Sequence, residues 1–462
     1  MKATLPPGTE EKVSTAATLR PSFRRPLSDP KVATAGTRRQ ALFLATLGFF
    51  GGFAGLAVFG PLVPRFQDVL ALSPVAAALL AAMPNLSGSL LRIPFGGAVD
   101  RFGGRRPMLT LLSITIVGLS GLLVLLGTSY PAHMAGTYPF LLALALLIGC
   151  GIASFSVGIA QVSYWFPKRA QGGALGTYGG LGNLSPGLST MLLPFAVGAL
   201  GMVTGYGIWL VILLAITLAY ALFIHDAPVF QLRASGIVLD PSTLAQLGGG
   251  DSIPSGTAKA GLLAAARVPA TWALVGFYFI SFGGFMALTT WLPTYWHAMY
   301  GASLRNAGLL AATFAILSAL VRVVGGIASD RLPIRFALAG NFALIFAGLT
   351  MVGLSHQFLV SLAGTIAVAT GMGLQNAIVF KLVPIYVPNA VGGASGWVGG
   401  IGALGGFVLP PIMGIATALV GGADAYARGF LPLAGLALLA IPFVFALDRW
   451  NRAHHVNVAA AV

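Results

Sequence analysis

Two arginines lie inside long apolar segments, and their chemistry needs an explanation. Arg92 and Arg322 would each sit within a membrane-spanning helix, where inserting an arginine costs about 2.5–3.5 kcal/mol. The acids nearest in sequence, Asp100 and Asp330, follow eight residues later, about 12 Å along a helix. That distance is too long for an ion pair on one helix. A buried ion pair is the structural alternative, but we expect both arginines to bind a substrate anion.

The remaining titratable residues favour the same interpretation. Both glutamates lie in the N-terminal tail, and the nine aspartates fall in expected loops or at helix ends. The histidines do so too: His133, His225, His297, His356, His454 and His455. We therefore expect no group in the middle of the membrane that relays protons or binds a cation. No nucleophile, acid–base pair or metal-ligand cluster indicates an enzyme, and we expect no cofactor and no metal.

The paired arginines also predict the kind of anion. Two guanidinium groups facing one cavity would repel each other by about 2 kcal/mol at ~8 Å and an effective dielectric constant of ~20. An anion between them would turn this repulsion into attraction. Because the guanidinium fork is planar and donates two parallel hydrogen bonds, it suits a small planar oxyanion.

Two glycine-rich stretches, 172–183 and 392–406, occupy corresponding places in the two halves of the chain. Small residues at four-residue spacing let membrane helices pack closely, and we accept that role for most of these glycines. Their density also predicts backbones close enough to narrow a central cavity to a ligand of a few atoms. Asn183 could donate its amide to that ligand. The glycines expected to line the substrate are Gly176, Gly179, Gly182, Gly399 and Gly402.

The composition places these residues in a membrane protein. The 462-residue chain is 57% hydrophobic and only 8% charged, whereas about a quarter of the residues in soluble domains are charged. We expect an all-α membrane protein of twelve transmembrane helices. Apolar spans able to cross ~30 Å of hydrocarbon are expected at 41–64, 74–99, 108–128, 139–164, 172–200, 203–225, 270–296, 303–328, 335–355, 357–386, 391–421 and 427–447.

These spans divide into two pseudo-symmetric sets of six, separated by a stretch rich in Gly, Ser, Pro and Thr. That composition predicts a flexible linker. The expected organisation is a basic cytoplasmic tail at 1–40, a six-helix bundle at 41–225, a cytoplasmic linker at 226–268, a second six-helix bundle at 269–448 and a cytoplasmic tail at 449–462.

The formal charge of +15 reflects membrane topology and not nucleic-acid binding. Of the 26 Lys and Arg, three fall in expected external loops and two inside helices, which leaves 21 on the side of the N-terminus. By the positive-inside rule, both termini are cytoplasmic, and we expect the cell inner membrane. Residues 1–40 lack the apolar core of a cleavable signal peptide. The lone Cys150 is expected to be an inert core residue.

An internal repeat relates the two halves. The sequence RIPFGGAVDR at 92–101 resembles RVVGGIASDR at 322–331, which lies 230 residues later. Two parallel halves related about the membrane normal are the architecture of the major facilitator superfamily. The sequence GGAVDRFGGRR at 96–106 also resembles that superfamily's loop motif between helices 2 and 3. The residues to which this resemblance gives gating or structural roles are Asp100, Arg101, Arg105, Asp330 and Arg331.

Together these features resemble the nitrate/nitrite porter family over about residues 40–450. Besides the arginines and the glycine-rich helices, the matching stretches are Gly-x-Gly-Asn at 180–183, Trp-Phe-Pro at 165–167, the aromatic–glycine stretch at 278–285 and Phe-Lys-Leu-Val-Pro at 380–384. The resemblance implies that Arg92 and Arg322 grip the anion from opposite halves. It further implies that Asn183 donates a hydrogen bond to the anion, while Tyr278 and Phe282 bound it. Ala403 stands where some members have Asn, which leaves the preference between nitrate and nitrite open.

The resemblance implies a secondary transporter that works by alternating access around a central site, in nitrate assimilation. Because no embedded acid or imidazole is expected, nitrate/nitrite antiport is favoured, and proton-coupled nitrate symport stays open. A porter for another small anion such as formate or oxalate is a second alternative, and a non-transporting membrane sensor is a third. Expected partners are the small anion and membrane lipid, with no nucleic acid, and a monomer is expected.

Overall fold

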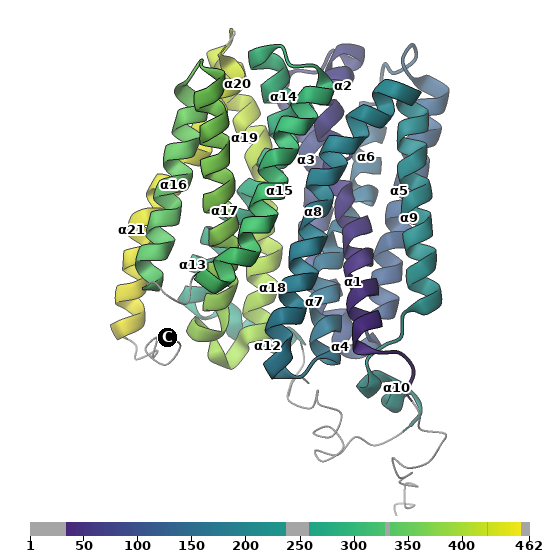
Figure 1. Cartoon of the computed structure of the whole chain (residues 1–462), viewed down its shortest axis with the longest axis vertical. Helices are drawn as coiled ribbons and strands as arrows, with labels where there is room; N and C mark the ends of the chain where they lie inside the picture. Colours follow the sequence, from purple (N-terminus) through teal and green to yellow (C-terminus); the bar gives the residue numbers. More distant parts are fainter. Residues whose placement is uncertain (1–33, 237–257, 329–332, 423, 454–462) are drawn as a thin grey trace, which may run out of the picture.

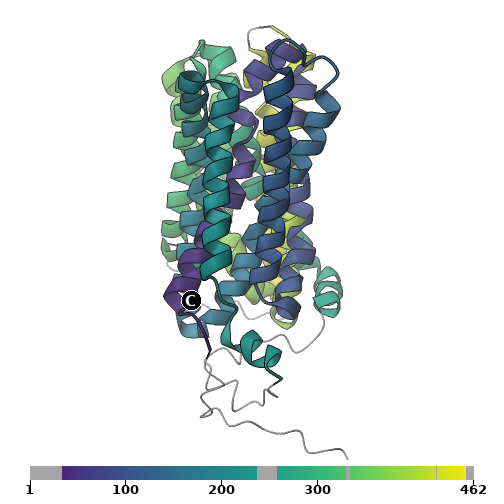
Figure 2. The ribbon, with the colours of Figure 1, turned by 90° about the vertical axis from the view of Figure 1, so that its right-hand side faces the viewer.

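The computed structural model describes residues 34–236, 258–328, 333–422 and 424–453. Within these ranges every regular element is a helix, and twelve helical segments are long and apolar enough to cross a membrane. The long helices run side by side in one upright bundle (Figures 1 and 2). The prediction of an all-α protein with twelve spans is therefore confirmed.

The first six spans precede residue 226, and two of them contain 3₁₀ breaks. Their elements are α1 (Arg38–Phe53), η2 (Ala54–Ala57), η3 (Gly60–Leu62) and α2 (Val63–Leu70) in the first span; α3 (Pro74–Leu90) and α4 (Arg92–Phe102) in the second; α5 (Arg105–Ser129); α6 (Tyr138–Gly149), η4 (Cys150–Ala153) and α7 (Ser154–Trp165) in the fourth; α8 (Lys168–Leu200); and α9 (Met202–Phe223).

The second six spans also include both continuous and broken helices. Their elements are α13 (Pro269–Tyr278), the π-helical turn η6 (Phe279–Gly283) and α14 (Gly284–Tyr300) in the seventh span; α15 (Leu304–Ala328); α16 (Ile334–Leu354); α17 (Phe358–Tyr386); η7 (Pro388–Ala390), α18 (Val391–Ile401), η8 (Gly402–Leu404) and α19 (Gly405–Val420) in the eleventh; and α20 (Ala425–Arg428) and α21 (Leu431–Ala453) in the last.

The first span is longer than its hydropathy predicts. The expected end was residue 64, but the helical segment runs from Arg38 to Leu70. Arg65 and Asp68 made the last turns resemble a loop. The structure instead continues the chain as the amphipathic helix α2, which buries Phe66 completely against the bundle. A charged residue on the outward face of such a helix lowers the average hydropathy without ending the helix.

The expected flexible linker contains two short helices, α10 (Pro228–Ala234) and α12 (Ala258–Ala266). Helix α12 packs on α18, where the indole N–H of Trp397 donates to the Leu262 carbonyl at 2.9 Å. The backbones meet so closely that a Cβ on Gly393 would stand 2.1 Å from the Gly261 oxygen. The linker at 226–268 thus contains two short helices that its composition did not predict, and residues 237–257 lie outside the described part.

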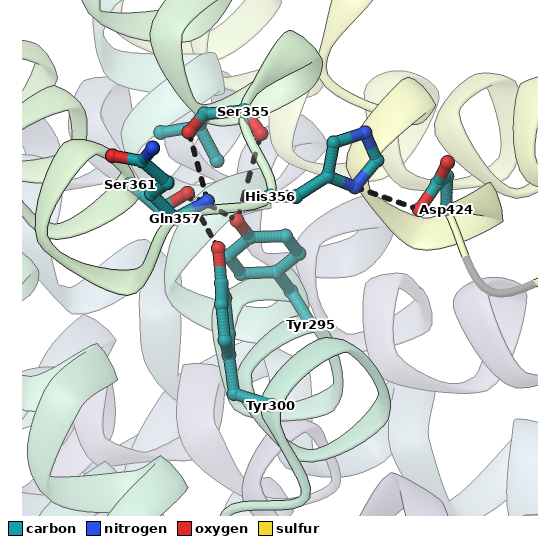
Figure 3. A network of polar contacts seen from close by, with 8 residues as sticks. Tyr295, Tyr300, Ser355, His356, Gln357, Ser361 and Asp424 are labelled. Atoms are coloured by element: carbon teal, nitrogen blue, oxygen red, sulfur yellow. Dashed lines mark hydrogen bonds and ion pairs between the residues drawn. The ribbon is translucent and has the colours of Figure 1, made fainter.

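A polar network joins loops at the end of the bundle away from the described termini (Figure 3). The hydroxyl groups of Tyr295 and Tyr300 lie 3.0 and 2.7 Å from the Ser361 Oγ. The His356 Nδ1 lies 3.0 Å from the Asp424 carboxylate. These contacts connect α14 with the start of α17, and the α16–α17 loop with the residue before α20.

The two halves of the chain meet along two long helix pairs. Helix α3 packs on α19, and α8 packs on α15. Glycines shorten these contacts: a Cβ on Gly308 would stand 2.7 Å from the Thr190 carbonyl oxygen. These pairs set the second and eighth spans, which carry the two intramembrane arginines, on the interface between the halves.

Candidate functional site

Arg92 is buried at the start of α4 with most of its hydrogen-bonding capacity unused. The side chain is 1% exposed. Its Nη1 donates to the Gly399 carbonyl of α18 at 3.1 Å, which reaches across to the other half of the chain. Its Nε and Nη2 are buried and have no hydrogen-bond partner in the described part of the chain. A buried cation with free donors is costly unless a ligand satisfies it.

Arg322, on α15, lies beside Arg92 against the same pair of aromatic rings. The guanidinium carbon of Arg92 is 4.9 Å from the ring centre of Phe155 and 5.1 Å from that of Phe282. The corresponding distances for Arg322 are 5.9 and 5.6 Å. The two rings lie 6.3 Å apart with planes 25° from parallel. The structure therefore brings both predicted arginines to one place, each within the ~6 Å range of cation–π attraction.

No carboxylate balances these two cations among the residues that the structure describes. The ion pairs found there involve Asp424 and Asp448, both near helix ends. The structural alternative raised by the sequence, a buried ion pair, thus has no partner in the described ranges. Two cations in a low-dielectric space without a counterion form a site that favours an anion.

More aromatic rings extend this centre. Tyr278 stacks on Phe282, with ring centres 4.8 Å apart and planes 10° from parallel. Phe380 of α17 meets the Tyr278 ring edge-on at 5.0 Å. Phe49 of α1 lies 5.3 Å from Phe155. Tyr178 of α8 stacks on Phe49 at 5.1 Å, so five spans contribute rings to this aromatic cluster, and Phe282 lies in the π-helical turn η6.

Asn183 lies on the face of α8 that is turned to α15, the helix of Arg322. On the same face, a Cβ added to Gly180 would stand 2.8 Å from an α15 side chain, and a Cβ added to Gly187 would stand 2.7 Å from another. Asn183 is 2% exposed, and its Nδ2 donates to the Gly179 carbonyl at 2.5 Å. The Oδ1 of Asn183 is buried and has no hydrogen-bond partner among the described atoms.

The five predicted lining glycines fall into three environments. A Cβ added to Gly182 would stand 1.9 Å from the Phe49 ring, and a Cβ added to Gly402 would stand 2.9 Å from Tyr278. Both glycines therefore make room for aromatic rings. Gly399 supplies the carbonyl that Arg92 binds. The remaining two, Gly176 and Gly179, have no packing neighbour within 4 Å of such a Cβ.

A protein-family model described as "Major Facilitator Superfamily" matches residues 42–410. The chain belongs to this superfamily. The "Probable nitrate/nitrite antiporter NarK1" of Thermus thermophilus is 32% identical over 83% of this chain and 86% of its own length. The "Nitrite extrusion protein" of Bacillus subtilis is 30% identical over 87% of this chain and 93% of its own. The solved structure of a D-xylose–proton symporter aligns with 88% of this chain and 97% of the symporter chain, with a TM-score of 0.69. At 16% sequence identity, this likeness shows a shared fold.

The resemblance noted from sequence is therefore confirmed: this facilitator has the major facilitator fold, and its relatives include proteins named as nitrate/nitrite transporters. With twelve apolar spans among its described residues, the chain is a multi-pass membrane protein.

The facilitator's loop motif makes contacts outside the aromatic centre. Asp100 accepts a hydrogen bond from the Tyr164 hydroxyl at 2.7 Å. The backbone N–H of Arg105 donates to the Asp226 carboxylate at 2.9 Å. Arg101 is exposed and lies over the ring of Phe102, the next residue. The repeat copies lie outside the described residues: Asp330 and Arg331.

Sequence reasoning missed several residues beside the arginines and beside the loop motif. Phe155 carries half of the ring pair, and its only sequence signal is an aromatic residue just after the glycine-containing break η4. Asn376 lies one turn before Phe380 on the same face of α17 and is 2% exposed, with a partnerless Oδ1 in the described structure. Asp226 and Tyr164 were missed because tertiary contacts alone connect them with the loop motif.

Proposed function

We propose that this facilitator carries nitrate and nitrite across the membrane by exchanging one anion for the other. The observation that carries the proposal is the pair of guanidinium groups over one pair of rings, with two Arg92 donors unused. Such donors satisfy an oxyanion. The names of the relatives from Thermus thermophilus and Bacillus subtilis supply the identity of the anion.

A small flat substrate suits the surroundings of the arginines. The Phe155 and Phe282 rings beside Arg92 offer no donors for a polyhydroxylated substrate, and Tyr278 stacked on Phe282 offers a single hydroxyl. Arg92, Arg322 and the Asn183 amide together supply the donors that a three-oxygen or two-oxygen anion can use. Formate and oxalate share this chemistry and are the alternative substrates.

Exchange, and not proton symport, is the proposed coupling. In the sequence, aspartates, glutamates and histidines are confined to tails, loops and helix ends, so a proton has no acid or imidazole relay beside the arginines. The empty site holds two cations that repel each other, which disfavours movement of the unloaded carrier. A bound anion removes that repulsion, so only the loaded carrier would reorient.

Alternating access is the proposed motion, with the bundles at 41–225 and 269–448 rocking about the arginines. At the end away from the described termini, the Gln67 amide of α2 donates to the Tyr426 hydroxyl of α20 at 3.1 Å. This contact joins the two halves and would open when the site faces that side. The excess of Lys and Arg at the other end supports cytoplasmic termini in the inner membrane. A monomer suffices, because both arginines come from one chain.

The test is anion flux in proteoliposomes that contain the purified full-length protein. Nitrate uptake should require nitrite inside, should proceed without a pH gradient, and should fail in Arg92→Ala and Arg322→Ala. The matched control is Arg39→Ala, an exposed arginine at the start of α1. Uptake driven by a pH gradient without internal nitrite would keep the site and overturn the coupling. Formate or oxalate uptake by an active protein that ignores nitrate would overturn the substrate.

A further inference from the structure

A basic groove lies between α16 and α21, away from the central arginines. Its lining, which defines the α16–α21 groove, is Arg335, Phe336, Phe445, Asp448, Arg449 and Arg452. Its volume of about 430 Å³ falls within the range of small-molecule sites. Figure 1 shows α16 and α21 at the left-hand edge of the bundle, and the groove lies at the start of α16 and the end of α21.

The charges of the groove do not balance. Arg335 lies 3.2 Å from the Asp448 carboxylate, and Arg452 pairs with the same carboxylate. Arg449 is exposed and has no ion-pair partner in the described ranges. One carboxylate therefore faces three guanidinium groups, which leaves an excess of two positive charges. An anion with several oxygens would accept from guanidinium forks that Asp448 alone cannot satisfy.

Two residues of the groove lining are aromatic. Phe336 is 55% exposed, and Phe445 is half-buried. Phe336 meets Phe445 edge-on at 6.3 Å, and the Arg335 guanidinium lies 4.8 Å above the Phe336 ring. An exposed ring on the outer edge of a membrane-spanning bundle offers an apolar surface for an acyl chain. Cations at a helix end above exposed rings match a ligand that has a charged head and an apolar tail.

We propose that the α16–α21 groove binds an anionic phospholipid of the leaflet at the end of the bundle that carries the described termini. The lipid phosphate would lie between Arg449 and Arg335, and an acyl chain would cover Phe336 and Phe445. Basic pockets between transmembrane helices are suited to such headgroups. A soluble phosphate would use the cations but leave the rings uncovered, so the lipid is the occupant that uses the whole groove. This inference does not depend on the identity of the transported anion.

The experiment is a lipid titration of the full-length protein in neutral detergent, followed by native mass spectrometry. Phosphatidylglycerol should bind more tightly than phosphatidylcholine, and glycerol phosphate should fail to compete. Arg449→Gln should weaken phosphatidylglycerol binding about fivefold, and Arg335→Gln with Arg449→Gln roughly twentyfold. Arg39→Gln removes an exposed arginine at the same end of the bundle, outside the groove, and should leave binding unchanged.

Each contrary result overturns the proposal in a different way. Equal retention of phosphatidylglycerol and phosphatidylcholine would mean that the charges do not select the lipid. Competition by glycerol phosphate at matching concentration would make this a soluble-phosphate site. An equal loss in Arg39→Gln and Arg449→Gln would indicate attraction by overall charge. Because Arg449 is exposed, its variant should fold even if the double variant does not.

Discussion

Arg92 and Arg322 come from two copies of one sequence repeat, yet the structure gives them different surroundings. Arg92 is 1% exposed and hydrogen-bonded to Gly399 of the opposite half. Arg322 is half-buried, and its guanidinium lies farther from both Phe155 and Phe282. The repeat therefore fixes where the two cations lie along the helices, while the packing of each half sets how fully each one is withdrawn from water.

This difference has a consequence for anion binding. A cation that has lost all its water is stabilised more by an arriving anion than one that keeps part of its hydration. The Arg92–Gly399 bond also connects α4 with α18, so it can persist only while these helices stay close. We infer that Arg92 holds the anion most firmly in this conformation and that Arg322 supplies the second, more adaptable contact.

The largest expected effect comes from removing the two arginines separately. Arg92→Ala should lower nitrate exchange by about 100-fold or more, which corresponds to about 2.7 kcal/mol, because it deletes the more deeply buried contact. Arg322→Ala should lower it by about tenfold. Initial rates of nitrate–nitrite exchange in proteoliposomes, with equal amounts of folded protein, provide the measurement. Equal losses in the two variants would mean that the difference in burial has no energetic meaning.

Lysine substitutions sharpen the comparison because they keep the charge and remove the fork. Arg92→Lys should cost about tenfold in apparent nitrate affinity, since a lysine cannot bind Gly399 and the anion with the same planar geometry. Arg322→Lys should cost about threefold. Competition of nitrate with labelled nitrite gives the affinities. Wild-type nitrate affinity in Arg92→Lys would show that position 92 requires only a positive charge.

The ring pair gives the next smaller effect. Phe155→Leu keeps an apolar side chain but removes cation–π attraction to both arginines, which should weaken nitrate binding about threefold to tenfold. Phe102→Leu is the matched control, because Phe102 lies under the exposed Arg101 outside the centre. Binding can be followed by titration of the purified proteins. If both leucine variants bind nitrate as the wild type does, the rings merely fill space.

The sequence predicted the charged part of this centre far better than its aromatic part. An arginine in an apolar helix is rare enough to stand out, and the 230-residue repeat identified Arg92 and Arg322 as a pair. Phenylalanines are frequent in any membrane helix, so Phe155 resembled ordinary packing. Its role depends on the η4 break and on η6, which are local departures from α-helix that hydropathy does not register.

The linker shows a similar limit. Its Gly, Ser and Pro content outweighs the Ala, Leu and Lys residues of α12 in any average over the segment. Helix α12 is held by Trp397 and by a glycine–glycine contact with α18, and neither contact is local in sequence. Tertiary packing supplies most of the stability of a helix this short. Single-sequence patterns cannot reveal a helix of that kind.

The smallest expected effect concerns the loop at 96–106, which anchors the half that holds Arg92. Asp226 lies outside the membrane spans and accepts the Arg105 N–H at 2.9 Å. Its carboxylate fills the space beside Gly103, whose φ of +75° suits glycine. Burial raises the pKa of Asp226 above its ordinary value, and this outweighs the opposing hydrogen bonds from the Arg105 and Gly104 backbone.

A raised pKa means that the folded protein holds this proton more tightly than the unfolded chain does. Stability from Asp226 is therefore full below the ordinary aspartate pKa and falls as the pH rises through the folded-state pKa. Asp226→Asn keeps an oxygen acceptor and cannot titrate, so the melting temperature of the wild type should fall relative to the variant by about 1–2 °C between pH 4 and pH 6. Parallel melting curves would mean that Asp226 titrates alike in both states. In that case the half-buried Asp226 carboxylate contributes no pH-dependent stability to the loop of the Arg92 half.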